Sequence, residues 1–223
     1  MMRRAVVTGA SSGIGAAVAE RLLAQGWAVT GISRSPPAPG IDHLALDLAS
    51  VTATELREAL AGLSVQALVH AAGILRVAPL GSLEQGDGAA MWRLHVECAG
   101  MLADVLLPAM TAGGRVVLIG SRTATGAAGR SQYAASKAAL VGLARSWAAE
   151  VASRGITVNV VAPGATETPM LKDPARGSVP PRMPPIGRFV QPGEVAALVS
   201  FLLGDEAAAI TGQQIVVCGG ASL

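Results

Sequence analysis

Tyr133 and Lys137 are the residues of this 223-residue sequence whose types and spacing most clearly permit chemistry. On a helix, residues four positions apart share a face, so the lysine ammonium can favour the phenolate form of the tyrosine. A free tyrosine has a pKa of about 10 and is poorly matched to proton transfer near neutral pH. The pair therefore predicts an acid/base tyrosine, while the same spacing also occurs on helix faces that meet only solvent.

Ser121 is a second group that could act on the same substrate atom. It follows the apolar run RVVLIG, which indicates a buried strand, and it precedes Tyr133 by 12 residues. In open α/β sheets, ligands bind beyond the carboxyl ends of the strands. A hydroxyl placed there can donate a hydrogen bond to a carbonyl oxygen on which negative charge develops. Thr123 is the less favoured candidate for this task.

A glycine-rich segment, TGASSGIG at residues 8–15, stands between the first apolar run and a helical stretch. Glycine allows a tight turn and close approach of a ligand, and a helix amino terminus offers free N–H groups to phosphates. A simple strand-to-helix turn would use similar residues, but the order of strand, loop and helix favours dinucleotide binding. The residues expected at the phosphates are Gly9, Ser11, Ser12, Gly13, Ile14 and Gly15.

The stretches that would position these groups alternate between two kinds. Short β-branched runs indicate strands, and the Ala- and Leu-rich stretches between them indicate helices. This alternation implies right-handed crossovers, so we expect an α/β fold built on a doubly wound parallel sheet with helices on both faces. The length suits a single domain over residues 1–223. The expected strands are 4–8, 27–32, 43–46, 65–70, 115–120, 156–162 and 213–217, and the expected helices are about 14–25, 53–60, 89–112, 132–153 and 193–203.

Residues 169–192 fit neither kind of element. They contain seven prolines and few periodic apolar positions, so they cannot form a regular helix throughout. We expect a Pro-rich loop that acts as a lid on the substrate side of the sheet.

Composition excludes several classes of function. Hydrophobic residues make up 51% of the chain, which suits strands buried on both faces, but no run of about 18 apolar residues is uninterrupted. The net charge of +2 comes from scattered basic residues, which form no footprint for nucleic acid. With no span and no signal peptide, we expect a cytoplasmic protein without membrane association. Cys98 and Cys218 lack metal-ligand spacing, so we expect structural thiols and no bound metal.

In order and spacing, these motifs resemble those of the short-chain dehydrogenase/reductase family over essentially the whole chain. The resemblance implies a Rossmann fold and an NAD(P)(H)-dependent oxidoreductase that transfers hydride between nicotinamide and a carbonyl or secondary alcohol. The landmarks are Gly9-x-x-x-Gly13-x-Gly15, Asp47 after the third strand, HAAG at residues 70–73 where the family usually has NNAG, Ser121, the Tyr133 and Lys137 pair, and Pro163-Gly164 after the sixth strand.

By resemblance, Ser121 polarises the substrate oxygen, Tyr133 passes the proton, and Lys137 lowers the tyrosine pKa and holds the nicotinamide ribose. The other implied cofactor contacts are Asp47 and Leu48 at the adenine, Ala71, Ala72 and Gly73 at the ribose, and Pro163, Gly164, Thr166 and Thr168 near the carboxamide. Asp47 would also suit a helix cap, and the two threonines could satisfy only local backbone groups. His70 is interpreted as a strand-end residue, because no neighbour in the sequence would pair with it.

Ser33 and Arg34 stand at the end of the second strand, where an acidic residue would hydrogen-bond the ribose hydroxyls of NAD. An arginine there can instead hold a 2′-phosphate with charge-assisted hydrogen bonds, which favours NADP(H) over NAD(H). The alternative is a solvated arginine, since the glycine loop carries Ser11 and Ser12 and lacks the second basic residue of some NADP-using relatives.

Glu97 is a departure from the family pattern. The segment VECAG stands where relatives carry a pattern like VNLxG, and the asparagine of that pattern helps to place a water near the lysine. A glutamate at this position could pair with Lys137 or relay protons, or it could compete with Tyr133 and weaken catalysis. Glu97 is therefore a candidate catalytic residue. It also supports an alternative function, a catalytically weak nucleotide-binding sensor or assembly protein, which the retained serine, tyrosine and lysine oppose.

The substrate and the oligomeric state are implied only by resemblance. Segments 71–76, 160–170 and 213–223 resemble the branch that includes 2,3-dihydro-2,3-dihydroxybenzoate dehydrogenase, in which Arg76 would meet a substrate carboxylate. That branch is NAD-linked, so a reductase of another small-molecule ketone or alcohol, or of a fatty-acid-like substrate, fits as well. Family members usually form tetramers or dimers through the helices that flank the fifth strand. The small residues Ala134, Ala135, Ala138 and Ala139 would permit such contact, so we expect a homo-oligomer.

Overall fold

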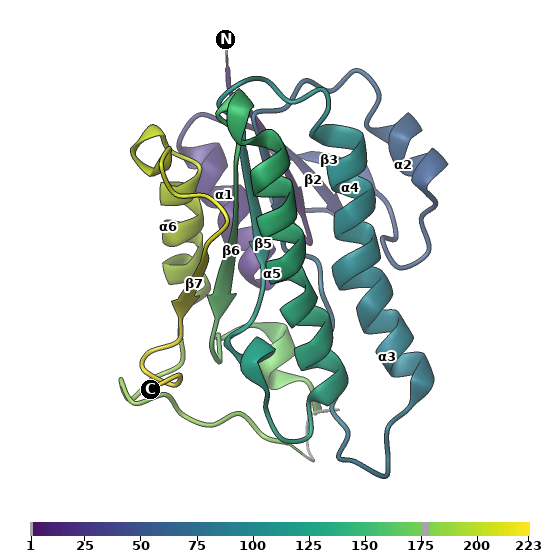
Figure 1. Cartoon of the computed structure of the whole chain (residues 1–223), viewed down its shortest axis with the longest axis vertical. Helices are drawn as coiled ribbons and strands as arrows, with labels where there is room; N and C mark the ends of the chain where they lie inside the picture. Colours follow the sequence, from purple (N-terminus) through teal and green to yellow (C-terminus); the bar gives the residue numbers. More distant parts are fainter. Residues whose placement is uncertain (1, 175–178) are drawn as a thin grey trace.

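Seven short strands, most of them rich in valine and isoleucine, form a parallel sheet at the centre of the molecule (Figure 1). The structure is a computed structural model that describes residues 2–174 and 179–223. The strand order is β3-β2-β1-β4-β5-β6-β7, which confirms the doubly wound α/β sheet expected from the alternating pattern. The strands are β1 (Arg4–Thr8), β2 (Ala28–Ser33), β3 (Asp42–Ala45), β4 (Ala67–His70), β5 (Arg115–Ile119), β6 (Thr157–Pro163) and β7 (Gln214–Val217).

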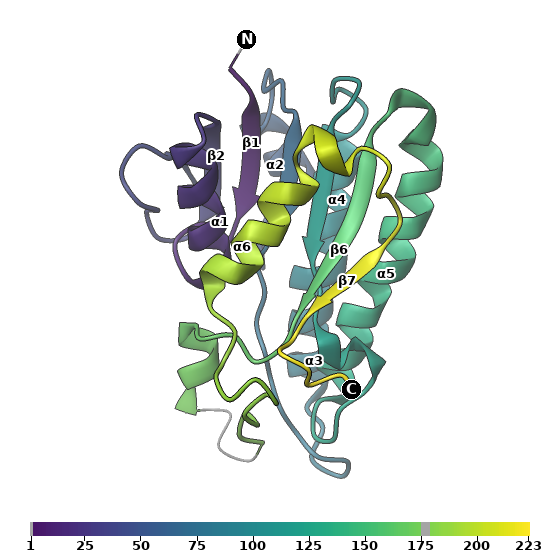
Figure 2. The ribbon, with the colours of Figure 1, turned by 90° about the vertical axis from the view of Figure 1, so that its left-hand side faces the viewer.

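Helices cover both faces of the sheet. Figure 2 shows α1 and α6 on one side of the strands, with α4 and α5 behind them on the other. None of the helices in the described residues has the length and apolarity needed to cross a membrane. The helices are α1 (Gly13–Ala24), α2 (Ala53–Ala59), α3 (Gln85–Trp92), α4 (Cys98–Leu106), α5 (Ser131–Val151) and α6 (Pro192–Leu202).

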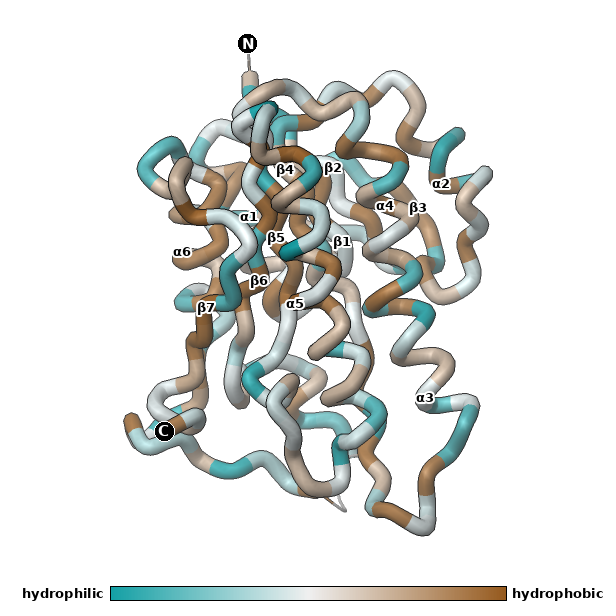
Figure 3. The backbone as a smooth tube through the Cα atoms, in the orientation of Figure 1, coloured by the Kyte–Doolittle hydropathy of each residue, from teal (hydrophilic) through white to brown (hydrophobic). Residues whose placement is uncertain are grey.

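Successive residues of a strand pack into two separate hydrophobic cores, one on each face of the sheet. Val6 packs among residues of α2, α4 and α5, whereas its neighbour Val7 packs among residues of α1 and α6. Val116 and Val117 of β5 divide in the same way. Because both faces are buried, the strands are apolar throughout, and they form the brown centre of the hydropathy view (Figure 3). Each fully buried valine or leucine contributes roughly 1.5–3 kcal/mol, so the sheet is a firm platform for its loops.

The helix expected at 89–112 begins earlier, ends earlier and changes type in its middle. It runs from Gln85 to Leu106 as α3, a π-helical turn η1 (Arg93–Glu97), and α4. Polar residues and glycines in its first turn hide the start from a search for apolar periodicity. Pro108 lies just beyond its end, and the proline ring and missing N–H disfavour the continuation that we expected to residue 112.

The Pro-rich segment 169–192 lies at the carboxyl edge of the sheet, near the lower side of Figure 1. It begins with the 3-10 turn η4 (Pro169–Lys172) and ends where α6 begins. An isolated bridge between Thr166 and Val190 fastens it to the loop that follows β6. Residues 175–178 of the expected lid lie outside the described residues. Elsewhere in the chain, Cys98 and Cys218 are both free and buried, which confirms the reading of these residues as unpaired thiols.

Candidate active site

The glycine cradle, the loop between β1 and α1, requires glycine at three positions. Gly9 and Gly13 have φ of +67° and +57°, a region that other residues rarely adopt. A Cβ on Gly15 would lie 2.2 Å from the carbonyl oxygen of Gly9. Ser12 is the N-cap of α1 but makes no side-chain cap bond, and the first turn has no acidic residue. The backbone N–H groups and the positive end of the helix thus suit a pyrophosphate.

The end of β2 places Ser33 and Arg34 differently. The Ser33 hydroxyl is buried and donates a hydrogen bond to the carbonyl oxygen of Ser35, 2.7 Å away. Arg34 is exposed, and within the described residues no hydrogen bond or ion pair engages its guanidinium. Arg34 is therefore available for an anionic ligand, while the Ser33 hydroxyl already has an acceptor.

The residues after β3 have local structural tasks. Asp47 Oδ1 accepts a hydrogen bond from the Ala49 N–H at 3.0 Å, so the carboxylate caps a turn, the alternative that the sequence left open. Leu48 is buried and packs in the core beneath α2 and α4. The Asp47 side chain is exposed, whereas that of Leu48 is enclosed by the core.

The turn that follows β4 is tied to β1 through one hydroxyl group. Thr8 Oγ1 accepts hydrogen bonds from the N–H groups of Ala71 and Ala72, each at 3.0 Å. The turn also passes close to the glycine loop, since a Cβ on Gly9 would lie 3.0 Å from the nitrogen of Ala72. Small residues at 71–73 therefore bring the backbone of this turn beside the phosphate cradle.

His70 has two partners that the sequence alone did not reveal. Its Nδ1 lies 3.0 Å from Thr8 Oγ1, and its Nε2 lies 3.1 Å from the Leu94 carbonyl oxygen in the π-helical turn. Because that threonine oxygen already accepts two N–H groups, its hydroxyl proton is donated to Nδ1, and Nε2–H is the donor to Leu94. Burial lowers the pKa of His70 to about 3, so this histidine is a neutral brace.

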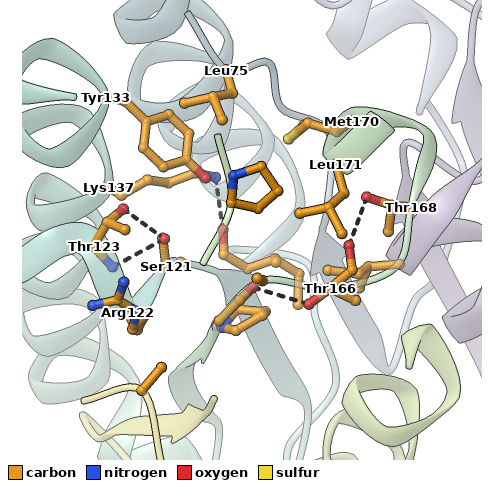
Figure 4. Close-up of a pocket in the computed structure, with 18 of the residues that line it drawn as sticks. Leu75, Ser121, Arg122, Thr123, Tyr133, Lys137, Thr166, Thr168, Met170 and Leu171 are labelled. Carbon is orange, nitrogen blue, oxygen red and sulfur yellow. Dashed lines mark hydrogen bonds between the residues drawn. The ribbon is translucent and has the colours of Figure 1, made fainter. Parts of the chain in front are cut away.

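Ser121 and Thr123 lie together at the carboxyl end of β5. Ser121 is the N-cap of the 3-10 turn η2 (Arg122–Thr125), and its Oγ accepts a hydrogen bond from the Thr123 N–H at 3.2 Å. The two hydroxyl oxygens are 2.8 Å apart, and both residues are buried. The cap fixes Ser121 facing the cavity, and the threonine hydroxyl is its immediate neighbour (Figure 4).

Tyr133 and Lys137 lie in the first two turns of α5, as the spacing predicted. Figure 4 shows both side chains directed into the same cavity as Ser121. Lys137 is buried, its ammonium lies 5.9 Å from the centroid of the Tyr133 ring, and it donates a hydrogen bond of 2.8 Å to the Ile119 carbonyl oxygen. Burial lowers the pKa of Lys137 to about 7. The helix and the end of β5 together hold the cation beside the phenol.

The loop after β6 carries the remaining predicted contacts. Pro163 ends the strand, and a Cβ on Gly164 would lie 2.9 Å from Cys218, so the chain passes closely there. The Thr166 hydroxyl donates to the Gly164 carbonyl oxygen at 3.1 Å, and the Thr168 hydroxyl donates to that of Thr166 at 3.3 Å. Thr168 also faces Gly13 across the glycine loop. Both threonines satisfy local backbone groups while lining the cavity.

A cavity of about 430 Å³ joins these groups. Its wall combines polar residues of the strand ends with an apolar side supplied by Leu75, Met170, Leu171 and Met183, and three arginines, Arg122, Arg130 and Arg182, stand among the lining residues. A more open groove extends from it past Ser12 and Arg76. This volume is of the size of small-molecule sites, and it places Ser121, Tyr133 and Lys137 at one end.

Glu97 does not pair with Lys137, which was one of the possibilities that the sequence left open. Its side chain is 50% exposed and forms an ion pair with Arg93 at 3.1 Å. The residue of the π-helical turn that lies inward is His95, which is fully buried and lies next to Tyr133 and Gly73. The sequence analysis missed His95 because it matched VECAG to a family pattern and therefore selected Glu97, two residues later. The signal for it was a histidine within an otherwise apolar helical stretch.

Comparison with known proteins gives the family. Residues 45–222 match the family model described as enoyl-(acyl carrier protein) reductase. The chain is 38% identical to the 3-oxoacyl-[acyl-carrier-protein] reductase FabG of Salmonella typhimurium, with 97% of this chain and 96% of that one covered. It is also 38% identical to carbonyl reductase family member 4 of Danio rerio, with 100% and 99% covered.

A solved structure extends the likeness to three dimensions. A short chain dehydrogenase from Burkholderia cenocepacia, determined in complex with NADP, superposes with a TM-score of 0.87 at 35% identity, covering 99% of this chain and 98% of that one. The strand order, the glycine cradle and the paired tyrosine and lysine agree with these matches. The chain therefore belongs to the short-chain dehydrogenase/reductase family of NAD(P)-dependent oxidoreductases, which act on carbonyl and alcohol groups.

Proposed function

We propose that this protein uses NADPH to reduce the keto group of a 3-oxoacyl thioester, with Tyr133 as the proton donor. The observation that carries the chemistry is the buried Lys137, held between the end of β5 and the Tyr133 ring in the cavity that Ser121 also lines. The substrate class is supported by the apolar cavity wall of Leu75, Met170, Leu171 and Met183. It is also supported by the full-length match to a 3-oxoacyl-[acyl-carrier-protein] reductase.

The roles of the chain's own residues follow from their chemistry. Bound nicotinamide would supply the hydride. Ser121, fixed by its cap bond, would donate a hydrogen bond to the keto oxygen as charge develops there. Tyr133 would transfer its phenolic proton to the same oxygen, and the Lys137 ammonium would stabilise the phenolate that is left. Ser121 and Lys137 are buried, which keeps their hydrogen bonds strong.

The cofactor would lie along the edge of the sheet. The glycine cradle and the start of α1 fit the pyrophosphate, and the turn at 71–73 and the loop after β6 would border the two ribose and nicotinamide portions. Lys137 has donor capacity beyond its bond to Ile119, which suits the hydroxyls of a ribose. Pro163, Gly164, Thr166 and Thr168 would line the carboxamide end.

We propose NADPH over NADH because Arg34 is exposed and unengaged at the end of β2. Replacing Arg34 by alanine should raise the dissociation constant for NADPH about tenfold and leave that for NADH unchanged, since only NADPH carries the 2′-phosphate. Binding is measured by the fluorescence of the reduced nicotinamide, with Arg57→Ala on the exposed surface of α2 as the control. Tighter binding of NADH by the unaltered protein would reject the proposal.

The substrate is tested by NADPH consumption with acetoacetyl and longer 3-oxoacyl thioesters, set against simple ketones. A preference for the thioesters supports the proposal, and faster turnover of a simple ketone contradicts the substrate class. A second substrate class, a cyclic dihydrodiol carboxylate, is favoured only by the local resemblance around Arg76. That arginine forms an ion pair with Asp87 at 3.5 Å, so a carboxylate ligand would compete with this partner. Oxidation of such a diol with NAD would favour the second class.

A non-catalytic sensor is the alternative from another class. NADPH binding without consumption by any carbonyl compound, in both the unaltered protein and Tyr133→Phe, would support it. The retained geometry of Ser121, Tyr133 and Lys137 opposes it.

We also propose that the protein is a homo-oligomer. The outer face of α5 exposes the small residues Ala135, Ala138 and Gly142, and a separate surface exposes Phe201 of α6 and Val216 of β7. Two such surfaces would suit a dimer of dimers. Sedimentation at micromolar concentration should show a dimer or tetramer, and a monomer alone would refute this.

A further inference from the structure

His95 joins two parts of the active site that are distant in sequence. It lies in the middle of the π-helical turn η1 and is fully buried. Its Nε2 lies 3.1 Å from the Ile74 nitrogen, and its Nδ1 lies 2.9 Å from Ser136 Oγ. Ile74 follows the turn at 71–73, and Ser136 lies on α5 between Tyr133 and Lys137. Turns of the π type are rare and often occur at functional sites, which is a separate reason to examine this residue.

The direction of each hydrogen bond is determined by the partners. A backbone N–H can only donate, so His95 Nε2 accepts from Ile74. The imidazole is neutral, because burial first and the charge of Lys137 second hold the pKa of His95 well below its usual value. Its single proton therefore lies on Nδ1 and is donated to Ser136 Oγ. The Ser136 hydroxyl in turn donates to the Tyr133 carbonyl oxygen at 2.9 Å.

The space around the ring leaves little freedom. A Cβ on Gly73 would lie 3.0 Å from His95 Nε2, which is a tight contact, and 3.5 Å from Lys137 Nζ, which is an ordinary one. The His95 and Tyr133 rings meet edge to face, with centroids 5.7 Å apart and planes at 84°. Any side chain larger than hydrogen at position 73 would displace one of these groups.

We propose that His95 is a positioning residue that holds the Tyr133 and Lys137 turn of α5 at a set distance from the backbone of Gly73 and Ile74. This inference rests on the proposed oxidoreductase function. It assigns His95 no proton transfer, because both ring nitrogens are committed to fixed partners. A transfer through the ring would require Nε2 to release the Ile74 N–H.

Substituting His95 with either of the two amide residues tests its hydrogen bonds to Ile74 and to Ser136 separately. A glutamine amide reaches the place of Nε2, so His95→Gln keeps the bond to Ile74 and loses the one to Ser136. An asparagine amide reaches the place of Nδ1, so His95→Asn keeps the Ser136 bond and loses the Ile74 bond. We expect His95→Gln to lower kcat on the order of tenfold to a hundredfold, since misplacement of reacting groups has effects of this size. His95→Asn should instead weaken NADPH binding and keep kcat within about threefold.

Ser136→Ala provides an independent test that disturbs the core less. It should reproduce the fall in kcat seen for His95→Gln, and the double variant should be no slower than either single variant, because both remove the same link. Ser200→Ala, which removes an exposed hydroxyl on α6, is the control. Thermal melting establishes that each variant is folded before its kinetics are compared.

Nitrogen-15 NMR of the imidazoles gives a readout that needs no turnover. We expect His95 to be the neutral Nδ1–H tautomer and His70 the neutral Nε2–H tautomer, both unchanged from pH 5 to pH 9. A His95 that carries its proton on Nε2, or that titrates within this range, overturns the proposal. Equal losses of kcat and NADPH affinity in the glutamine and asparagine variants also overturn it, because they indicate general disruption. Absence of NADPH-dependent turnover in the unaltered protein rejects the proposed function instead and leaves the tautomer result to decide the geometry.

Discussion

A cationic side chain is buried at each edge of the sheet, and the two differ in how many hydrogen-bond acceptors surround them. Arg115, at the amino end of β5, and Lys137, at its carboxyl end, are both only 5% exposed. Within the described residues, neither forms an ion pair with a carboxylate. Arg115 donates hydrogen bonds to the carbonyl oxygens of Gly113, Gly114, Gly155 and Gly204. Lys137 donates to the carbonyl oxygen of Ile119 alone in the part of the chain described.

Helix direction explains this difference. In a parallel sheet with helical crossovers, the helices end at the amino edge, where their carbonyl groups and negative dipole ends gather. Gly155 follows α5 and Gly204 follows α6, so Arg115 sits where such groups converge. At the carboxyl edge the helices begin, and a cation there has fewer acceptors. A cation with several carbonyl acceptors stabilises the fold, whereas a cation with one acceptor is available to a ligand.

The largest expected effect comes from removing the phenol that Lys137 faces. Tyr133→Phe should lower kcat/KM about 10²- to 10⁴-fold, because the proton donor is lost while the cavity keeps its shape. Steady-state NADPH oxidation measures the change, and NADPH fluorescence checks that binding persists. Retention of more than a tenth of the activity would show that another group supplies the proton.

Removing the cation at the other edge should change stability and not chemistry. Arg115→Met removes the donor from the carbonyl oxygens of Gly114 and Gly155, among others, and should lower the free energy of unfolding by about 3 kcal/mol. Urea unfolding measures the loss, and kcat at a temperature well below the melting point should stay within about twofold. Arg115→Lys keeps the charge but loses the guanidinium donors. Its free energy of unfolding should lie between those of the unaltered protein and Arg115→Met. A large fall in the kcat of Arg115→Met would contradict the assignment of a purely stabilising role to this arginine.

The burial of Lys137 predicts how stability depends on pH. Its folded pKa of about 7 lies below the unfolded value of about 10.4, so the unfolded chain binds more protons between these values. Stability of the cofactor-free protein should therefore rise with pH in this window. Relative to Lys137→Met, it should gain roughly 2 kcal/mol between pH 7 and pH 9, measured by urea unfolding. If the free energy of unfolding depends on pH in the same way in the two proteins, burial does not lower the pKa of this lysine.

The smallest expected effect is at Glu97, for which the sequence left pairing with the lysine open. Glu97→Gln removes a surface ion pair with Arg93, which is worth about 0–1 kcal/mol. Turnover and its pH profile should stay within about twofold of the unaltered protein. A clear shift of the profile would restore Glu97 to the mechanism.

The sequence predicted what is local and missed what spans the fold. The glycine loop, the serine at a strand end and the one-turn spacing of tyrosine and lysine each depend on a few adjacent residues. The His95 and Ser136 bond joins residues 41 positions apart, and the Arg115 and Gly204 bond joins residues 89 apart. No local pattern contains such pairs. Glu97 became a candidate because VECAG was matched to a family pattern, whereas the buried polar residue of the π turn is His95, two positions earlier.

The π turn η1 also rotates the part of the continuous helix that follows it relative to the part that precedes it. The Cys98 N–H bonds to the Arg93 carbonyl, five residues earlier, so one residue more than an α-helix requires is accommodated. A residue of α-helix corresponds to about 100° of rotation, and this rotation separates the buried face of α3 from that of α4. Deleting one residue within η1 would restore a regular helix and turn α4 relative to the sheet. The inward histidine and the packing of α4 are therefore coupled through chain length, so we expect a deletion within η1 to disturb both.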